Sequence, residues 1–418
     1  RKMKYEFPKN FYWGAATSSH QVEGNNHNDW SEWEKSEKRI SYLRTQGLIE
    51  KHGLENFISG KACDHYNHFQ EDFNIAQSLG HNAHRFSIEW SRIEPEEGKF
   101  DDGEIEHYRQ VLRALKDSRL EPFVTLWHFN LPVWFSKNGG FENKNSPEIF
   151  ARYCGYVVEK LGDMAQFWVT INEPEVYAKA SYLTREWPPQ KKSQMSRLFV
   201  IHNLIRAHRK VYNVIKKLNQ NAQVGIAKNN TYFEAHQNKW INRLLKKFMD
   251  WWWNFYFLNR IKNHQDFIGL NHYSHNRINY GFNKNENQKV SDMGWELYPE
   301  AIYHVLMDLK LYNKPIYITE NGLADAKDQK RGWFIFETLK WIHKAIEQGA
   351  DVKGYLHWSL MDNVELDKGF WPRFGLLEID RKTLERKIRP SANFYRDVCM
   401  ANGITEDTVN TYQSLLVL

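Results

Sequence analysis

PIYITENGLADAKDQKRGWFIFETLKWIHKAIEQGADVKGYLHW, residues 315–358, contains two short apolar runs separated by a longer helical stretch. The runs at 315–319 and 352–358 are continuous rather than alternating, which is typical of parallel strands buried on both faces. Between 332 and 348 the apolar residues recur with the period of a helix. This part of the chain therefore predicts a strand, a helix and a second strand.

Similar units occur along the whole chain. We predict strands at 11–17, 83–88, 122–129, 167–171, 224–227, 267–271, 315–319 and 352–358. We predict helices at 64–79, 147–161, 196–218, 299–311, 332–348 and 390–401. Eight such units without a Pro/Gly/Ser-rich linker predict an α/β protein with a single (β/α)8 barrel domain over residues 1–418. The alternative is a doubly wound open sheet, which is disfavoured because no GxGxxG or GxxxxGK motif follows a strand.

Composition narrows the classes of function. Of the 418 residues, 41% are hydrophobic and 26% are charged with both signs mixed, which excludes a disordered chain. The net charge of +6 is mild, and its densest part, residues 206–217, has the pattern of a solvated helix face without a nucleic-acid-binding motif. No run of about 18 apolar residues exists. We therefore expect no nucleic-acid partner, no membrane span and no membrane partner.

The three cysteines indicate a reducing compartment. Cys63, Cys154 and Cys399 are odd in number, lie far apart and form no CxxC motif. Residues 1–12 do not have the pattern of a signal peptide, so we expect a cytoplasmic protein. Cys63, His65 and His68 lie together at a predicted helix start without a fourth ligand, and we expect no metal site there.

Two glutamates directly follow predicted strands. Glu173 lies in the motif VTINEP, and Glu320 lies in IYITENG. In a (β/α)8 barrel the chemistry lies at these carboxyl ends of the strands, where a lone buried charge is costly unless it is paired or useful. The other strand ends are rich in Trp, His, Asn and Gln, a mixture that suits a carbohydrate with its apolar ring faces and many hydroxyls.

Two facing carboxyl groups are what the cleavage of a glycosidic bond requires. One must be protonated to release the leaving group, and the other must be ionised to meet positive charge at the anomeric carbon. We expect Arg85 and Tyr273, which lie at or near other strand ends, to favour the ionised form of one carboxyl. Burial and the neighbouring negative charge would raise the pKa of the other.

The ordered motifs of the chain resemble those of the glycoside hydrolase family 1 β-glycosidases over nearly its whole length. The matching segments are FPKNFYWGAATSSHQVEG, GHNAHRFSIEWSRIEP, TLWHFNLPVWF, FWVTINEP, DFIGLNHY, PIYITENG, GYLHWSLMDN and RFGL. The resemblance implies a retaining, exo-acting β-glycosidase of the β-glucosidase, β-galactosidase or β-fucosidase type. It implies a double-displacement reaction on small β-glycosides or oligosaccharides, and this reaction requires no metal or other cofactor.

The same resemblance assigns residues. Glu173 matches the general acid/base and Glu320 the nucleophile. Catalytic support falls to Arg85 and Tyr273, which hold the nucleophile, to Asn172 at the sugar 2-hydroxyl, and to Asn271. Substrate binding falls to a set of residues near the strand ends, with Trp358 under the sugar ring: Gln21, Trp127, His128, Trp358, Glu365 and Phe374. Since Glu365 would repel a phosphate, a neutral glycone is favoured.

Several positions depart from the family pattern. Leu366 stands in place of a Trp that contacts the sugar, and Glu175 follows NEP where an apolar or aromatic residue is common. His84 and His272 are unusual at their positions, and Arg185 replaces a common Gly. These departures keep a second hypothesis open, a carbohydrate-binding barrel with weakened catalysis. A third class, a metal-dependent aldolase or hydrolase barrel, lacks clustered His and Asp ligands. Gluco and galacto substrates are not separated by these residues.

The segment between Phe233 and Phe267 is short for this family. It contains the aromatic run DWWWNFYF, residues 250–257. We expect this run to form a buried face of an outer helix. The alternative is an aromatic-lined opening near Trp251–Phe257 that holds a planar apolar ligand.

Overall fold

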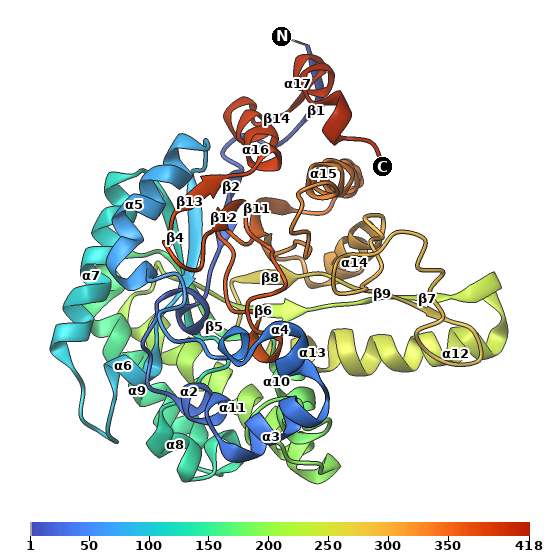
Figure 1. Cartoon of the computed structure of the whole chain (residues 1–418). Coiled ribbons are helices and arrows are strands. Elements are labelled where there is room, and N and C mark those ends of the chain that lie inside the picture. Colours follow the sequence, from blue (N-terminus) through green and yellow to red (C-terminus); the bar gives the residue numbers. More distant parts are fainter. Residues whose placement is uncertain (1) are drawn as a thin grey trace.

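The computed structural model describes residues 2–418, which form a closed barrel of eight parallel strands in the order β10-β11-β2-β3-β4-β5-β6-β8 (Figure 1). The strands are β2 (Tyr12–Ala16), β3 (Ala83–Ser87), β4 (Glu121–Trp127), β5 (Phe167–Asn172), β6 (Gln223–Asn229), β8 (Phe267–Asn271), β10 (Ile316–Glu320) and β11 (Val352–Trp358). Each predicted strand overlaps one of these. The predicted (β/α)8 barrel is confirmed.

Six helices agree with the sequence prediction to within about two residues at most ends. They are α5 (His65–Ser78), α9 (Ser146–Leu161), α11 (Gln194–Leu218), α14 (Ala301–Leu309), α15 (Arg331–Glu347) and α16 (Pro390–Ala401). Two further helices beside the barrel were not predicted, α7 (Asp102–Asp117) and α10 (Pro174–Tyr182). The signals for α7 were present, since the Asp101 side chain caps its first turn and its buried residues recur with a helical period.

Shorter helices complete the loops. They are α1 (Ser19–Val22), α2 (Asp29–Glu34), α3 (Glu37–Thr45), α4 (Leu48–His52), α6 (Trp90–Ile93), α8 (Val133–Lys137), α12 (Trp240–Met249), α13 (Tyr256–Ile261) and α17 (Glu406–Thr411). Near the chain ends, β1 (Met3–Glu6) pairs antiparallel with β14 (Gly403–Thr405), and β12 (Leu377–Ile379) pairs with β13 (Arg386–Ile388). Within residues 2–418, no helix has both the length and the apolar character that crossing a bilayer requires.

Aromatic side chains fill part of the inside of the barrel. Phe123 and Phe167 stack with their ring centroids 4.4 Å apart, and Tyr317 packs on both at 5.3 Å. The strands also approach closely where the glutamates emerge. At Gly322, two residues after Glu320, an added Cβ would lie 1.9 Å from the carbonyl oxygen of Trp358. Only glycine therefore lets β10 end so close to the end of β11.

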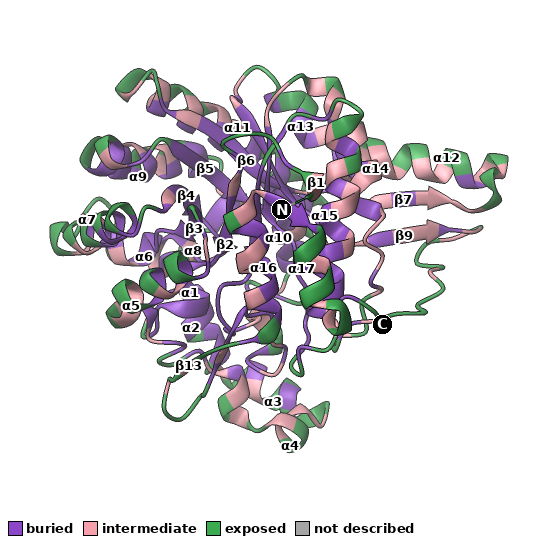
Figure 2. Cartoon of the chain, turned by 90° about the horizontal axis from the view of Figure 1, so that it is seen from above, coloured by how far each residue is buried: buried purple, intermediate pink, exposed green. Residues whose placement is uncertain are grey.

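An arm projects from the barrel on the side of β6 and β8 (Figures 1 and 2). It consists of β7 (Tyr232–Ala235) and β9 (His275–Ile278), which pair in parallel, and of α12, which packs against both. A π-helical turn, Asp250–Phe255, connects α12 to α13. The expectation that residues 250–257 form a buried helix face is wrong for most of them, because the chain leaves the barrel wall here. Trp251 is exposed, and Trp252 and Trp253 are half-buried.

Candidate active site

A cavity of about 710 Å³ opens at the carboxyl ends of the barrel strands. Both glutamates of the sequence motifs line it, together with five other residues that the resemblance assigned to the site: Gln21, His128, Tyr273, Trp358 and Glu365. The barrel thus brings side chains from six of its strand ends or following loops to one opening, as parallel strands do.

Glu320, the last residue of β10, is held by a cation and a phenol. Arg85 Nη1 donates to Oε1 of Glu320 at 2.6 Å, and the Tyr273 hydroxyl donates to Oε2 at 2.9 Å. Burial raises the pKa of Glu320, while the charge of Arg85 and the two hydrogen bonds act in the opposite direction. Both oxygens therefore have donors that stabilise the carboxylate, and hydrogen bonds of this charge-assisted kind are strong ones.

Glu173 directly follows β5 and has a left-handed backbone with φ 47°. Pro174 begins α10 at the next residue. Two amides donate hydrogen bonds to the Glu173 carboxyl, Asn271 Nδ2 at 2.7 Å and Asn229 Nδ2 at 3.4 Å. Burial, followed by the charge of Glu320, raises the pKa of Glu173 to about 8. This carboxyl is therefore protonated at neutral pH.

A buried polar network connects the two glutamates. Arg85 Nη2 donates to Oδ1 of Asn172 at 2.7 Å, and Asn271 Nδ2 donates to the same oxygen at 3.0 Å. Thr125 accepts from Arg85 Nε at 3.0 Å, and Thr319 donates to Oδ1 of Asn271 at 2.6 Å. The two threonines were not predicted. The sequence signal for both is a hydroxyl side chain inside an otherwise apolar strand.

The remaining polar groups surround an aromatic surface. The rings of Trp358 and His128 are nearly parallel, with centroids 5.9 Å apart. Burial, followed by the charge of Glu320, raises the pKa of Glu365 to about 8. Among residues 2–418, Oε2 of Glu365 and Nδ1 of His128 are buried without a hydrogen-bond partner. Such atoms are costly unless a ligand satisfies them, and a sugar hydroxyl can do so.

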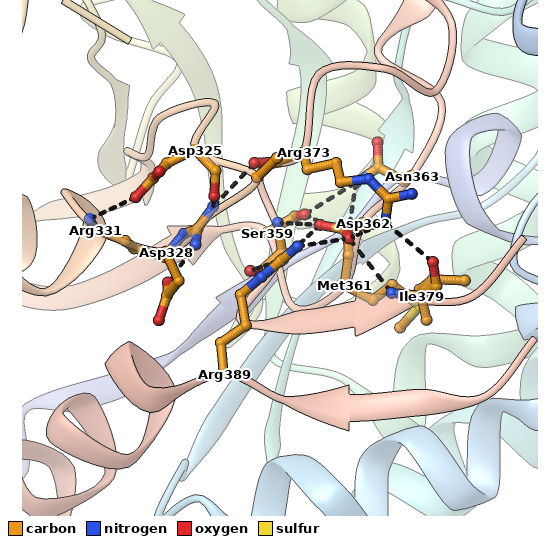
Figure 3. A network of polar contacts seen from close by, with 12 residues as sticks. Asp325, Asp328, Arg331, Ser359, Met361, Asp362, Asn363, Arg373, Ile379 and Arg389 are labelled. Carbon is orange, nitrogen blue, oxygen red and sulfur yellow. Dashed lines mark hydrogen bonds and ion pairs between the residues drawn. The ribbon is translucent and has the colours of Figure 1, made fainter. Parts of the chain in front are cut away.

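A second polar network holds the loop that carries Glu365 (Figure 3). The Asp362 carboxylate accepts from Arg389 at 2.7 Å and from Arg373 at 2.9 Å. Asn363 Nδ2 donates to the Ser359 hydroxyl at 2.9 Å. Gln21 Nε2 joins this loop from the opposite end of the chain, because it donates to the carbonyl of Val364 at 2.7 Å.

Trp127 and Phe374 lie behind the cavity wall rather than in it. The Trp127 indole is buried, donates to the carbonyl of Asn130 at 3.0 Å and packs against Tyr177 with ring centroids 4.7 Å apart. Phe374 belongs to the apolar cluster that contains Trp358. Leu366, which replaces the expected Trp, lines the cavity and keeps its wall apolar there.

Glu175 does not point into the cavity. It lies 3.3 Å from the ammonium group of Lys228 on β6, and both side chains are buried. Lys228 Nζ also donates to Asn230 Oδ1 at 2.9 Å and to the carbonyl of Trp253 at 2.7 Å. The unusual glutamate therefore has its own counter-ion, and this pair connects β6 to α10 and to the π-helical turn.

The other departures have local explanations. Arg185 is exposed at φ 62°, in the left-handed region where glycine is the usual residue. His272 Nδ1 lies 2.9 Å from the carbonyl of Asn230, and His84 Nε2 lies 3.3 Å from the Thr17 hydroxyl. Among residues 2–418, no group of three or more His, Cys, Asp or Glu side chains is arranged to hold a metal ion.

The fold and the paired carboxyl groups at one barrel mouth are the architecture of a glycosidase. The chain belongs to glycosyl hydrolase family 1, whose model matches residues 3–258 and 241–404. It is a β-glucosidase-like, retaining O-glycosyl hydrolase.

Relatives support this membership over nearly the whole chain. The β-glucosidase A of Thermotoga maritima is 33% identical, over 96% of this chain and 99% of its own. The 1,4-β-D-glucan glucohydrolase of Thermotoga neapolitana is 32% identical, over 96% and 100%. Among solved structures, a β-glycosidase from Pyrococcus horikoshii is similar with a TM-score of 0.87 and 37% identity, covering 98% of both chains. The Thermotoga maritima β-glucosidase in complex with glucoimidazole has a TM-score of 0.87 at 30% identity, covering 96% of this chain and 100% of its own.

Proposed function

We propose that the protein hydrolyses non-phosphorylated β-glycosides, such as β-glucosides, β-galactosides or β-fucosides, from the non-reducing end, with Glu320 as nucleophile and Glu173 as general acid/base. The observation that carries the proposal is the unequal pairing of the two carboxyl groups. Arg85 and Tyr273 stabilise the charge of Glu320, whereas Glu173 accepts hydrogen bonds from the amides of Asn271 and Asn229 and has a pKa raised to about 8.

The reaction has two steps. A carboxylate oxygen of Glu320 attacks the anomeric carbon while Glu173 gives its proton to the departing glycosidic oxygen, which leaves a glycosyl ester on Glu320. Esterification removes the charge of Glu320, which is one cause of the raised pKa of Glu173. The pKa of Glu173 therefore falls, and its carboxyl becomes the anion that acts as general base. It takes a proton from water, and the hydroxide attacks the anomeric carbon and frees Glu320 with net retention.

The cavity supplies the binding groups. Trp358 offers a ring face for the sugar, and Gln21, His128 and Glu365 offer polar atoms for its hydroxyls. Asn172, which lies between Arg85 and His128, is assigned to the 2-hydroxyl. Trp127 and Phe374 support the wall behind this shell. A phosphate on the sugar would meet the negative charge of Glu320, which favours a neutral glycone. The proposed mechanism uses no metal and no other cofactor.

A carbohydrate-binding barrel with weakened catalysis is the second candidate function. It is favoured by Leu366, which removes an indole and its N–H donor from the cavity wall. It is disfavoured because both glutamates keep the partners that hydrolysis needs. The free, buried thiols of Cys63, Cys154 and Cys399 support a cytoplasmic location.

The release of p-nitrophenol from p-nitrophenyl β-D-glucoside, with and without EDTA, separates the hypotheses. Release that is insensitive to the chelator supports the proposal, and NMR should detect the β-anomer of glucose first. Release that EDTA abolishes would indicate a metal-dependent barrel. An absence of release, with glucose-derived inhibitors still bound, would indicate the binding protein.

A further inference from the structure

The arm carries a row of exposed apolar side chains. Trp240, Leu244, Phe248 and Trp251 are spaced by four, four and three residues, so they lie along one side of α12 and the turn that follows it. Their exposed fractions are 67%, 55%, 54% and 48%. Figure 2 shows α12 projecting beyond the barrel helices. We call these four residues the apolar stripe.

The stripe is not the side by which α12 attaches to the protein. The attached side has Ile241, Leu245 and Met249, which are partly buried, and Asn242, which is fully buried and accepts from the backbone N–H of Tyr280 at 2.8 Å. Met249 lines the active-site cavity. The helix therefore has apolar residues on its inner side, which packing explains, and a second apolar surface, which packing does not explain.

Basic residues accompany the stripe. Residues 239–251 contain Lys239, Arg243, Lys246 and Lys247 against one acidic residue, Asp250. Lys246 pairs with Asp250 at 2.9 Å. Arg243 and Lys247 are exposed and form no ion pair with any residue of 2–418. At 100° per residue, these two positions lie beside the stripe on the solvent side of the helix.

We propose that the apolar stripe docks the protein on the surface of an anionic lipid bilayer. An amphipathic helix with Trp, Phe and Leu on one side and unpaired basic residues beside them has the composition of an interfacial helix. Tryptophan favours the headgroup region, and each basic residue near an anionic surface adds attraction. The stripe spans only ~16 Å along the helix, so it lies in the plane of the membrane and does not cross it. The proposed peripheral binding differs from the sequence expectation of no membrane partner.

Charge favours lipid over a second copy of the chain. Pairing two stripes face to face would bring Arg243 and Lys247 of both copies to one interface, where like charges repel. An anionic headgroup layer supplies the opposite charge. The four stripe residues do not line the cavity, so they can be substituted without removing a group from the catalytic site.

Co-sedimentation of the full chain with vesicles tests the proposal. Vesicles of phosphatidylcholine mixed with phosphatidylglycerol should bind the protein, and binding should weaken as salt is added. Leu244→Ser with Phe248→Ser should reduce the partition coefficient by roughly tenfold or more. Hydrolysis of p-nitrophenyl β-D-glucoside in bulk solution should stay unchanged. Arg243→Gln with Lys247→Gln should lower binding to the mixed vesicles and remove most of its salt dependence.

Matched controls distinguish the outcomes. Tyr42→Ser with Met400→Ser removes two exposed apolar side chains, 52% and 72% exposed, from α3 and α16, and binding should not change. Failure of the mixed vesicles to bind the protein, or equal binding by the stripe variant, would overturn the proposal. A dimer in light scattering that the stripe variant converts to a monomer, without vesicle binding, would assign the stripe to a second copy. Vesicle binding without hydrolysis would refute the proposed function alone.

Discussion

The two glutamates at the barrel mouth are chemically identical and lie in one cavity, yet their surroundings differ in kind. Glu320 receives one hydrogen bond from a guanidinium and one from a phenol. Glu173 receives its hydrogen bonds from Asn271 and Asn229. Burial raises the pKa of both glutamates, but only Glu320 of the two contacts Arg85 directly. The fold therefore favours opposite protonation states for two residues of one type, because it places the Arg85 guanidinium against Glu320 and not against Glu173.

Removal of Glu320 should have the largest effect. Glu320→Ala deletes the only proposed nucleophile, and we expect kcat for p-nitrophenyl β-D-glucoside to fall by ~10⁵-fold or more. Circular dichroism should confirm that the variant is folded. Added azide can occupy the vacated space and attack the anomeric carbon directly, which should give an α-glycosyl azide. Wild-type turnover in this variant would refute the assignment.

Loss of Glu173 should be smaller and should depend on the leaving group. For an alkyl glucoside, Glu173→Gln should reduce kcat/KM by ~10²–10⁴-fold, because the departing oxygen no longer receives a proton. For p-nitrophenyl β-D-glucoside the glycosylation step should lose much less, since this leaving group needs little protonation. Pre-steady-state measurements with both substrates should separate the two cases. An equal loss with both substrates would contradict the assignment of Glu173 as the proton donor.

The pair of Lys228 and Glu175 should matter for stability. Lys228→Met leaves Glu175 buried without its counter-ion, and we expect unfolding to require ~3–5 kcal/mol less. The double variant Lys228→Met with Glu175→Leu should recover most of that loss, because it removes both charges. Urea unfolding of the three proteins gives the comparison. A double variant no more stable than Lys228→Met would contradict the pairing.

Tyr273→Phe should have a modest effect that identifies its target. The phenylalanine removes one hydrogen bond to a charged group, and we expect kcat/KM to fall by ~10-fold.

The pH profile tells which glutamate Tyr273 acts on. Activity needs Glu320 ionised, so it is lost as pH falls through the pKa of Glu320. It also needs Glu173 protonated, so it is lost as pH rises through a pKa of about 8. Tyr273→Phe should raise the pKa of Glu320 and move the acidic limb to higher pH, while the basic limb stays in place. Movement of the basic limb instead would place the effect on Glu173.

The barrel was readable from the sequence because its strands are buried on both faces and appear as continuous apolar runs. The strands that carry Glu173 and Glu320 were found in this way, and so were the outer helices with a clear period. The arm was not found, since β7 and β9 are only four residues long each and α12 has apolar residues on two sides.

Contacts between distant residues were also beyond the sequence pattern. The pairing of Glu175 with Lys228 joins two elements that are far apart in the chain, so nothing local indicated it. From the sequence, Glu175 was therefore interpreted as a departure that could weaken the site. The family resemblance assigned Trp127 to the sugar pocket, whereas the structure places it behind the cavity wall.

Helix α12 serves two environments at once. Met249 forms part of the rim of the catalytic cavity, and Leu244 and Phe248 on the other side of the same ten-residue helix face outward. Contact on the outer side of α12 would therefore lie within about one helix diameter of the cavity wall. We therefore expect interfacial activation, in which one glycoside is cleaved at different rates in bulk water and on a lipid surface.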